Sequence, residues 1–342
     1  MSTEIGVQLG ESLSASNVDE AFVATLKCVM RFGHHVETYP YEQSSRARSS
    51  KEILNFQLSI HNPLDRILTN SVRRFNCVEA VARVVWMLAA NNRAEDIAFY
   101  QSKAREYADN RLSLSGSNYG QRIFESRPGL NQAEGVLNTL RREVGSRRAA
   151  IVIWSPEDAV RESNDIPCAF GLFFHQRNDY LTCTTIMRSN NAFLLLPYNI
   201  FEFSLLGEMI ARTLGIKLGP YMHISASMHV YDDESDRAYE AITVHDSTGE
   251  QSRLLMPPMP SVPAPFEQAE ELAYLEALLR HDYALYDPEE LHARSKNLHE
   301  YWQAFYEVLL VHALCRAGRI TQARDIAGQL PGYFRESMES LP

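Results

Sequence analysis

Apolar and polar positions change their pattern along the chain. Over residues 17–127 the pattern is mostly helical, and Val78–Ala90 carries apolar residues on most faces, as a buried helix does. Over residues 149–231 the pattern turns to strands. The predicted strands are Ala149–Trp154, Ala169–His175, Tyr180–Arg188 and Tyr221–Tyr231. A polar turn at residues 176–179 joins the second of these strands to the third, which predicts a hairpin.

A further helix is predicted between this hairpin and the last strand. Tyr198–Leu214 has apolar positions that recur on all sides, so we expect the helix to be packed within the fold. A buried central helix surrounded by sheet predicts the α+β class.

Prolines separate the C-terminal part of the chain from the rest. Met256–Phe266 contains five prolines, which remove backbone donors and favour extended conformations, so we expect a linker or strap. Helical periodicity follows in Glu267–Arg280 and Leu291–Arg316, with Gly318 as a stop, and no internal repeat is visible. The predicted division is a main domain at 1–255, a proline-rich linker at 256–266 and a helical extension at 267–342.

Composition narrows the classes of partner. The 342 residues, 45% of them apolar, can form a sizeable core, and a net charge of −10 makes nucleic acid an unfavourable partner. No apolar run reaches the roughly 18 residues that span a membrane, and Met1–Ser16 lacks the features of a secretory signal, so we expect a cytoplasmic protein. The five cysteines are scattered without metal-ligand spacing, which predicts neither a disulfide framework nor a metal site.

Cys168 follows Pro167 directly before an apolar strand. The local sequence alone favours a buried structural cysteine, because free cysteines are among the most buried residues. A nucleophilic thiolate would need nearby positive charge. Arg147 and Arg148 precede the first strand, and Arg188 with Ser189 follows the third. Paired arginines are usually solvated, yet arginine and serine at strand ends also form a fork for phosphate.

Three more polar residues have a structural and a functional interpretation. Asn199 stands at the start of the predicted central helix, as an N-cap or as an amide that matches the O4 and N3–H edge of a uracil-type base. His229 and Tyr231 alternate on one face of the last strand and by default are half-buried polar residues.

The order of these motifs resembles the thymidylate synthase family, including the deoxycytidylate and cytidylate hydroxymethylases. The resemblance covers about residues 46–231 and implies a thymidylate synthase-like fold with a mixed sheet and a buried central helix. Ser117–Gln121 and Asn131–Gln132 fall where the family has its Tyr-Gly and Asp-Gln segments. The motifs are Ser146–Arg148, Ile151–Trp154, Pro167–Cys168, Arg188–Ser189, Leu196–Ile200 and His229–Tyr231. The helices beyond the prolines are unlike the classical enzymes and closer to the nucleotide hydroxymethylases.

The resemblance implies a role for each matching position. Cys168 would add to C6 of a pyrimidine nucleoside 5′-monophosphate, which makes C5 nucleophilic toward 5,10-methylenetetrahydrofolate. By position, the phosphate would be held by Arg188, Ser189 and either Arg46 or Arg48, and by Arg147 and Arg148 of the partner in a homodimer with shared sites. The remaining implied roles are Tyr119 in the reaction, Asn199 on the base, His229 and Tyr231 on the sugar, and Asn191 and Trp86 on folate, with no metal.

The chain departs from the family pattern at several positions. The family glutamate three residues before the tryptophan is Arg83 here, and a guanidinium cannot accept a proton at neutral pH. Glu79 lies one helical turn earlier and is the candidate substitute. Ala169 replaces a histidine, and Asn191 replaces a folate-contacting aspartate. The ending Glu339–Pro342 lacks the family's short apolar tail, so a wetter site would favour a hydroxymethyl product.

These observations leave three hypotheses of different kinds. The first is hydroxymethyl transfer to a pyrimidine nucleoside monophosphate, with ordinary thymidylate synthesis from dUMP as the alternative within that class. The second is a nucleotide-binding homologue that lost turnover with Arg83, although the retained Cys168 argues against full decay. RNA binding is a weaker third. Base and sugar preference stay open, because an amide at Asn199 suits uracil but can rotate to serve cytosine.

Overall fold

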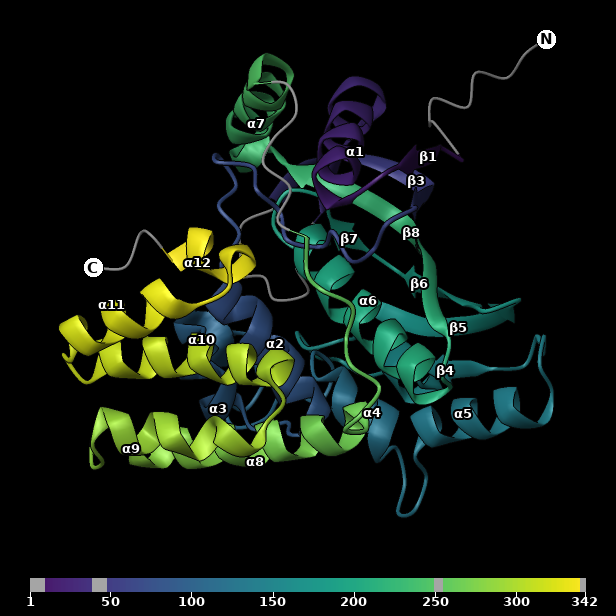
Figure 1. Ribbon diagram of the computed structural model, residues 1–342. Coiled ribbons are helices and arrows are strands. Elements are labelled where there is room, and N and C mark those ends of the chain that lie inside the picture. Colours follow the sequence, from purple (N-terminus) through teal and green to yellow (C-terminus); the bar gives the residue numbers. More distant parts are fainter. Residues whose placement is uncertain (1–9, 39–47, 249–254, 339–342) are drawn as a thin grey trace, which may run out of the picture.

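The computed structural model describes residues 10–38, 48–248 and 255–338, and it has an eight-stranded mixed sheet with helices packed against it (Figure 1). The strand order is β1-β3-β8-β6-β5-β4, with β2 paired to β3 and β7 paired to β8. The strands are β1 (Ser12–Ala15), β2 (His34–Thr38), β3 (Arg48–Ile60), β4 (Ala150–Val152), β5 (Ala169–Arg177), β6 (Tyr180–Met187), β7 (Asn190–Asn191) and β8 (Lys217–Tyr231). The predicted α+β class and the β5–β6 hairpin are confirmed.

Helices make up most of the remaining chain. The α-helices are α1 (Val18–Phe32), α2 (Cys77–Leu88), α3 (Ala94–Ala98), α4 (Tyr119–Phe124), α5 (Gln132–Arg142), α6 (Leu196–Thr213), α7 (Ser235–Thr248), α8 (Pro265–Asp282), α9 (Pro288–Ala293), α10 (Glu300–Arg316), α11 (Ile320–Gln329) and α12 (Gly332–Met338). Short 3₁₀ helices cover 102–106, 156–159, 232–234 and 294–297. Among the described residues, no helix is both long enough and apolar enough to cross a membrane.

The central helix α6 is buried along almost its whole length, as its all-round apolar pattern predicts. It packs on β6 and β8 on one side and on α2 and α8 on the other. A Cβ at Gly207 would come within 2.9 Å of the Cβ of Cys183 on β6, so only glycine allows this close approach. The structure thus confirms a helix that lies between the sheet and the other helices (Figure 1).

Strand directions bring distant segments to one end of the sheet. β6 and β8 run parallel, so the end of each lies on the same side. β5 runs antiparallel to β6 and β3 runs antiparallel to β8, which places the start of both strands at that same end. The residues after β6 and the last residues of β8 therefore lie at the same end of the sheet as the residues before β5 and the first residues of β3.

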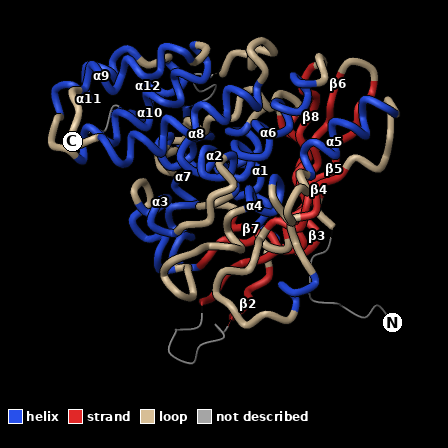
Figure 2. The backbone as a smooth tube through the Cα atoms, turned by 90° about the horizontal axis from the view of Figure 1, so that it is seen from below, coloured by secondary structure: helices blue, strands red, loops and turns tan. Residues whose placement is uncertain are grey.

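The C-terminal helices pack on the rest of the protein. Figure 2 shows the strands gathered on one side of the molecule and helices α8 to α11 on the other. In the segment with the prolines, Met259 donates its backbone N–H to Glu208 of α6 at 2.7 Å, and Glu208 also pairs with Arg66 at 2.6 Å. Farther on, Tyr100 donates to Glu276 of α8, and Arg280 pairs with Asp96. The predicted division into domain, linker and extension stays a prediction.

The structure differs from the sequence pattern in two places. The region at 17–127 contains β2 and the 13-residue strand β3 besides its helices, so the mostly helical prediction is wrong for this part. The predicted helix Leu291–Arg316 is divided into α9, a short 3₁₀ turn and α10, with an extended residue at Leu298 between them. Gly318 has φ of 74°, the left-handed conformation that a glycine stop adopts.

Candidate active site at the strand ends

Cys168 stands directly before β5, beside the residue that follows β6. The pairing of Ala169 with Met187 places Arg188 next to Cys168, and the Arg188 N–H donates to the Cys168 carbonyl at 2.8 Å. The Arg188 guanidinium also donates through Nε to the Pro167 carbonyl at 2.8 Å, and its Nη2 lies 3.7 Å from the Cys168 sulfur. The structure therefore brings together the thiol and one guanidinium that the sequence placed 20 residues apart.

Opposing effects act on the thiol of Cys168. Burial raises its pKa, while the guanidinium groups of Arg188 and Arg83 act to lower it, and Asp165 adds to the rise. Burial prevails, so the pKa lies above the ordinary value and the free protein holds mostly thiol at neutral pH. The half-buried sulfur lies 3.7 Å from the Arg188 guanidinium and also feels the Arg83 charge, a setting in which a thiolate is stabilised once it forms.

Asp165 anchors the segment that carries Tyr119. Its carboxylate accepts the backbone N–H groups of Gly116 and Ser117, each at 2.7 Å. A Cβ at Gly116 would fall 1.9 Å from the Asp165 carbonyl oxygen, so the approach requires glycine. Tyr119 is buried, stacks on Phe203 at 5.5 Å, and interacts electrostatically with Cys168. The sequence predicted Tyr119 for the site, and the structure places it there.

The predicted sugar-binding residues lie next to the predicted phosphate-binding residues. His229 and Tyr231 share a face of β8, with ring centroids 4.9 Å apart, and Ser189 Oγ lies 3.5 Å from His229 Nδ1. Arg48, at the start of β3, stacks on Tyr231 with its guanidinium carbon 3.5 Å from the ring centroid. Arg46, the other candidate for this arginine, lies outside the described residues.

Asn199 lies inside the first turn of α6, which begins at Leu196, so it is not the N-cap residue. Its amide oxygen accepts from Asn190 Nδ2 at 2.9 Å, and the Asn190 oxygen lies 3.0 Å from His223 Nε2. Tyr221 OH extends the chain to His223 Nδ1 at 3.1 Å. This buried network fixes the orientation of the Asn199 amide, and no motif in the sequence indicates Asn190, His223 or Tyr221 as its partners.

Two buried polar atoms near the predicted folate-binding residues have no hydrogen-bond partner among the described residues. One is the indole N–H of Trp86, and the other is Oε1 of Glu234, whose Oε2 accepts from Asn191 Nδ2 at 2.8 Å. Such unsatisfied groups are costly unless a ligand or water pairs with them. Each of these two atoms is free to pair with a polar group of a ligand at its own position, Trp86 beside Tyr100 and Glu276, and Glu234 beside Asn191.

The other predicted residues are placed as follows. Arg147 and Arg148 lie exposed between α5 and β4, where Arg148 pairs with Glu143 at 2.6 Å.

Arg83 and half-buried Glu79 lie on α2, and the Arg83 guanidinium pairs with Glu202 of α6 at 3.7 Å. Sequence reasoning missed Glu202. An acidic side chain within an otherwise apolar, buried helix was the signal that could have found it, because such a group requires a partner.

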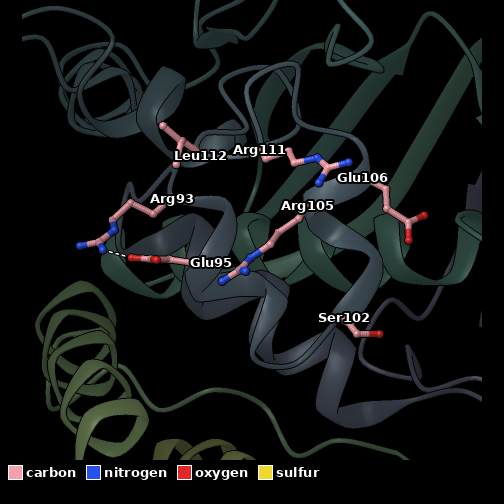
Figure 3. A pocket seen from close by; sticks show the side chains of 7 residues that line it. All are labelled: Arg93, Glu95, Ser102, Arg105, Glu106, Arg111 and Leu112. Atoms are coloured by element: carbon pink, nitrogen blue, oxygen red, sulfur yellow. Dashed lines mark ion pairs between the residues drawn. The ribbon is translucent and has the colours of Figure 1, made fainter.

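A separate surface depression lies away from these residues. Figure 3 shows its lining, in which Arg93 pairs with Glu95 while Arg105 and Arg111 come from the following segment. None of the residues predicted for the site lines this depression.

Two buried histidines predict how stability depends on pH. Burial lowers the pKa of His223 to about 3 and that of His229 to about 4, with Arg48 and Arg188 adding to the effect at His229. Below pH 6.5 these two histidines bind protons in the unfolded chain but not in the folded chain, so the stability that they contribute falls as pH drops from about 6.5 to about 4. Each histidine contributes up to about 1.4 kcal/mol per pH unit.

Urea unfolding at several pH values measures this slope. We expect His223→Gln to reduce the slope of the unfolding free energy against pH between pH 6 and pH 4.5. The reduction should correspond to about one bound proton, or about 1.4 kcal/mol per pH unit. Exposed His281 provides the matched control, because His281→Gln should leave the slope as in the parent protein. An unchanged slope in His223→Gln would contradict the assignment.

Comparison with known proteins agrees with this geometry. The family model described as thymidylate synthase matches residues 21–260. A Methanocaldococcus jannaschii protein, whose name assigns it provisionally as a thymidylate synthase, is 33% identical over 39% of this chain and 65% of its own length. A deoxyuridylate hydroxymethyltransferase of Pseudomonas phage M6 is 28% identical over 50% of this chain and 49% of its own length. A Methanosarcina mazei protein with the same provisional name is 26% identical over 67% of this chain and 93% of its own length. The chain thus spans less than two thirds of the first two relatives.

Proposed function

Because the chain belongs to the thymidylate synthase family, we propose that it transfers a one-carbon unit to C5 of a pyrimidine nucleoside 5′-monophosphate, as a hydroxymethyl group, through a covalent bond between Cys168 and C6. The observation that carries the proposal is the Arg188 guanidinium 3.7 Å from the Cys168 sulfur, at the strand end where His229 and Tyr231 also lie. One arginine there can stabilise the thiolate and bind a phosphate.

Each residue of the site has a part in this chemistry. The Cys168 thiolate forms a bond to C6, and the electron pair of the C5–C6 double bond moves toward C5 and O4. Arg188, Ser189 and Arg48 hold the phosphate, while His229 and Tyr231 contact the sugar. The amide of Asn199 pairs with the edge of the base. The same cysteine leaves C6 when the C5–C6 double bond forms again.

The one-carbon donor in this proposal is 5,10-methylenetetrahydrofolate, held by Trp86, Asn191 and Glu234. When bound, it would supply an electrophilic methylene group. The unpartnered indole N–H of Trp86 and the unpartnered carboxylate oxygen of Glu234 support this assignment. A hydroxymethyl product requires water at the site, and the similarity to the phage M6 deoxyuridylate hydroxymethyltransferase favours that product over a methyl group.

A homodimer with shared sites is part of the proposal. One face of the sheet carries apolar side chains that remain exposed, among them Val152 and Phe173 at 55% and 39%. An apolar sheet face of this kind favours a second subunit. Arg147 and Arg148 are exposed and so can reach a site in the partner.

The test follows tritium release from 5-tritiated dUMP, UMP, dCMP and CMP with methylenetetrahydrofolate, and identifies the product by mass. A gain of one hydroxymethyl group supports the proposal, and a gain of one methyl group indicates thymidylate synthesis. The position of Arg83 favours a second candidate, a nucleotide-binding protein without turnover. Nucleotide binding with no tritium release from any of the four would favour that candidate and contradict ours.

A further inference from the structure

Two glutamates of α6 are buried beside arginines, but they are satisfied to different degrees. Glu208 lies 2.6 Å from Arg66 through Oε2 and accepts the Met259 N–H at 2.7 Å through Oε1. Glu202 is just as buried, with 5% of its side chain exposed, yet its Oε2 lies 3.7 Å from Arg83 and has no hydrogen-bond partner among the described residues. Both carboxylate oxygens of Glu208 are hydrogen-bonded, as in a structural ion pair, whereas Oε2 of Glu202 can still accept a hydrogen bond or a proton.

Glu202 also lies on the site side of α6. It follows Asn199 by three residues and so shares a helix face with that amide. Tyr119 interacts electrostatically with both Cys168 and Glu202, and the Arg83 charge acts on Cys168 as well as on Glu202. Electrostatic interactions thus link four side chains from four segments, Arg83 of α2, Tyr119 of α4, Cys168 and Glu202, and the Arg83–Glu202 ion pair stands among them.

Burial suits Glu202 to proton transfer. It raises the pKa of Glu202, and the Arg83 charge acts in the opposite direction. A carboxylate whose pKa rises toward neutral pH is a better proton acceptor than an exposed one. Arg83 cannot accept a proton, so a carboxylate at this place must come from another element.

We propose that Glu202 takes up the C5 proton of the nucleotide and that Arg83 is its positioning residue. The inference rests on the proposed function. It assigns the proton-transfer role to the carboxylate of the central helix that pairs with Arg83. Glu79, the candidate substitute on α2, is half-buried, and no hydrogen bond joins its carboxylate to the other site residues that the structure describes.

The proton step can be written on the nucleotide alone. Cys168 adds to C6, and the π electron pair becomes an enolate across C5 and O4. C5 then takes a deuteron from the Glu202 carboxyl, exchanged with D₂O, and becomes tetrahedral. In reverse, Glu202 removes the original proton, the C–H electron pair forms the enolate again, and the thiolate leaves as the C5–C6 double bond returns. The net result is exchange of hydrogen for deuterium at C5, and no other reactant is needed.

The experiment measures this exchange by NMR in D₂O with dUMP, UMP, dCMP or CMP and without folate. We expect Glu202→Gln to slow exchange by about 10²- to 10⁴-fold, the range for a lost general base. Nucleotide affinity should change by less than about threefold, because Gln keeps the size of the side chain. Glu134→Gln, at an exposed glutamate of α5, is the matched control and should leave the exchange rate within about threefold of the parent protein. Glu79→Gln tests the alternative carboxylate on α2.

Two further variants separate a chemical role from a structural one. Glu202→Asp keeps the carboxylate and should retain part of the exchange, which also serves if Glu202→Gln does not fold. Arg83→Gln removes the cation that opposes the rise in the Glu202 pKa, so the pH at which exchange reaches half its maximum should move upward. The other titratable groups that act on Glu202 or Arg83 are Tyr119, Tyr198, Tyr221, Cys168 and Glu79, and these variants retain all five.

The outcomes distinguish this inference from the proposed function. Unchanged exchange in folded Glu202→Gln overturns the role of Glu202 and leaves the role of Cys168 intact. Loss of exchange in Glu79→Gln with retention in Glu202→Gln transfers the role to Glu79. If the parent protein binds the nucleotides but exchanges none of them, the covalent step of the proposed function fails, and this inference fails with it.

Discussion

Replacing Cys168 with serine is expected to lower turnover by roughly 10⁴- to 10⁶-fold, the range seen when a covalent nucleophile is removed. A serine hydroxyl does not ionise near neutral pH, so the cations at the site have no anion to stabilise. Arg188 and Arg83 lower the pKa of a group at this position, although burial outweighs them even for a thiol. The measurement is tritium release under saturating nucleotide and folate.

The control for this variant is Cys315→Ser, which changes a half-buried thiol at the end of α10, a helix that carries none of the predicted site residues. Its turnover should match that of the parent protein. Cys168→Ser should still bind nucleotide with an unchanged dissociation constant, since serine is slightly smaller than cysteine and Arg188 keeps its bonds to Pro167 and Ile166. Turnover above about 1% of the parent value would contradict a covalent role for Cys168.

The strands and the central helix were predictable because their patterns extend over many residues. In α6 the apolar positions recur on all sides, and in β6 burial alternates along the strand as the side-chain period of two requires. β3 carries the same signal, since Phe56, Leu58 and Ile60 alternate with polar residues. The helical periodicity of the flanking segments dominates residues 17–127, and this hides the strand in the pattern of the whole region.

The site was predictable where its residues belong to ordered motifs. Cys168, Arg188 and His229 each stand at a strand end, so a correct strand order brings them together. The partners of these residues were not predictable. Glu202 and Arg83 are 119 positions apart, and the Asn190–His223 contact joins β7 to β8 inside the core. Such contacts depend on how helices and strands pack, which the spacing along one sequence does not contain.

A substitution pattern follows from the position of Arg83. An arginine on α2 places a permanent charge where the family has a carboxylate, and burying that charge without a partner would be costly. The carboxylate of Glu202 on α6 neutralises the Arg83 guanidinium, so the two facing helices carry one negative and one positive charge. Arg83 therefore has its carboxylate partner on the facing helix, which is the physical reason to look there for the group that transfers the proton.

Replacing Arg188 with alanine is expected to weaken nucleotide binding by about 10²- to 10⁴-fold. Two charge-assisted hydrogen bonds to a phosphate contribute about 1.5 to 3 kcal/mol each, which gives this range. Arg188→Lys should recover part of the affinity, because lysine keeps the charge but not the two-pronged donor geometry. Isothermal titration with nucleoside monophosphates provides the dissociation constants.

The nucleoside without its phosphate separates the two roles of Arg188. If the guanidinium binds phosphate, Arg188→Ala should lower the affinity for the monophosphate and leave that for the nucleoside unchanged. Arg177→Ala is the matched control, because Arg177 is an exposed arginine at the opposite end of β5. Equal losses for nucleotide and nucleoside would mean that Arg188 only shapes the loop through its bonds to Ile166 and Pro167. In that case the phosphate must be held elsewhere, and Arg48, stacked on Tyr231, becomes the first residue to substitute.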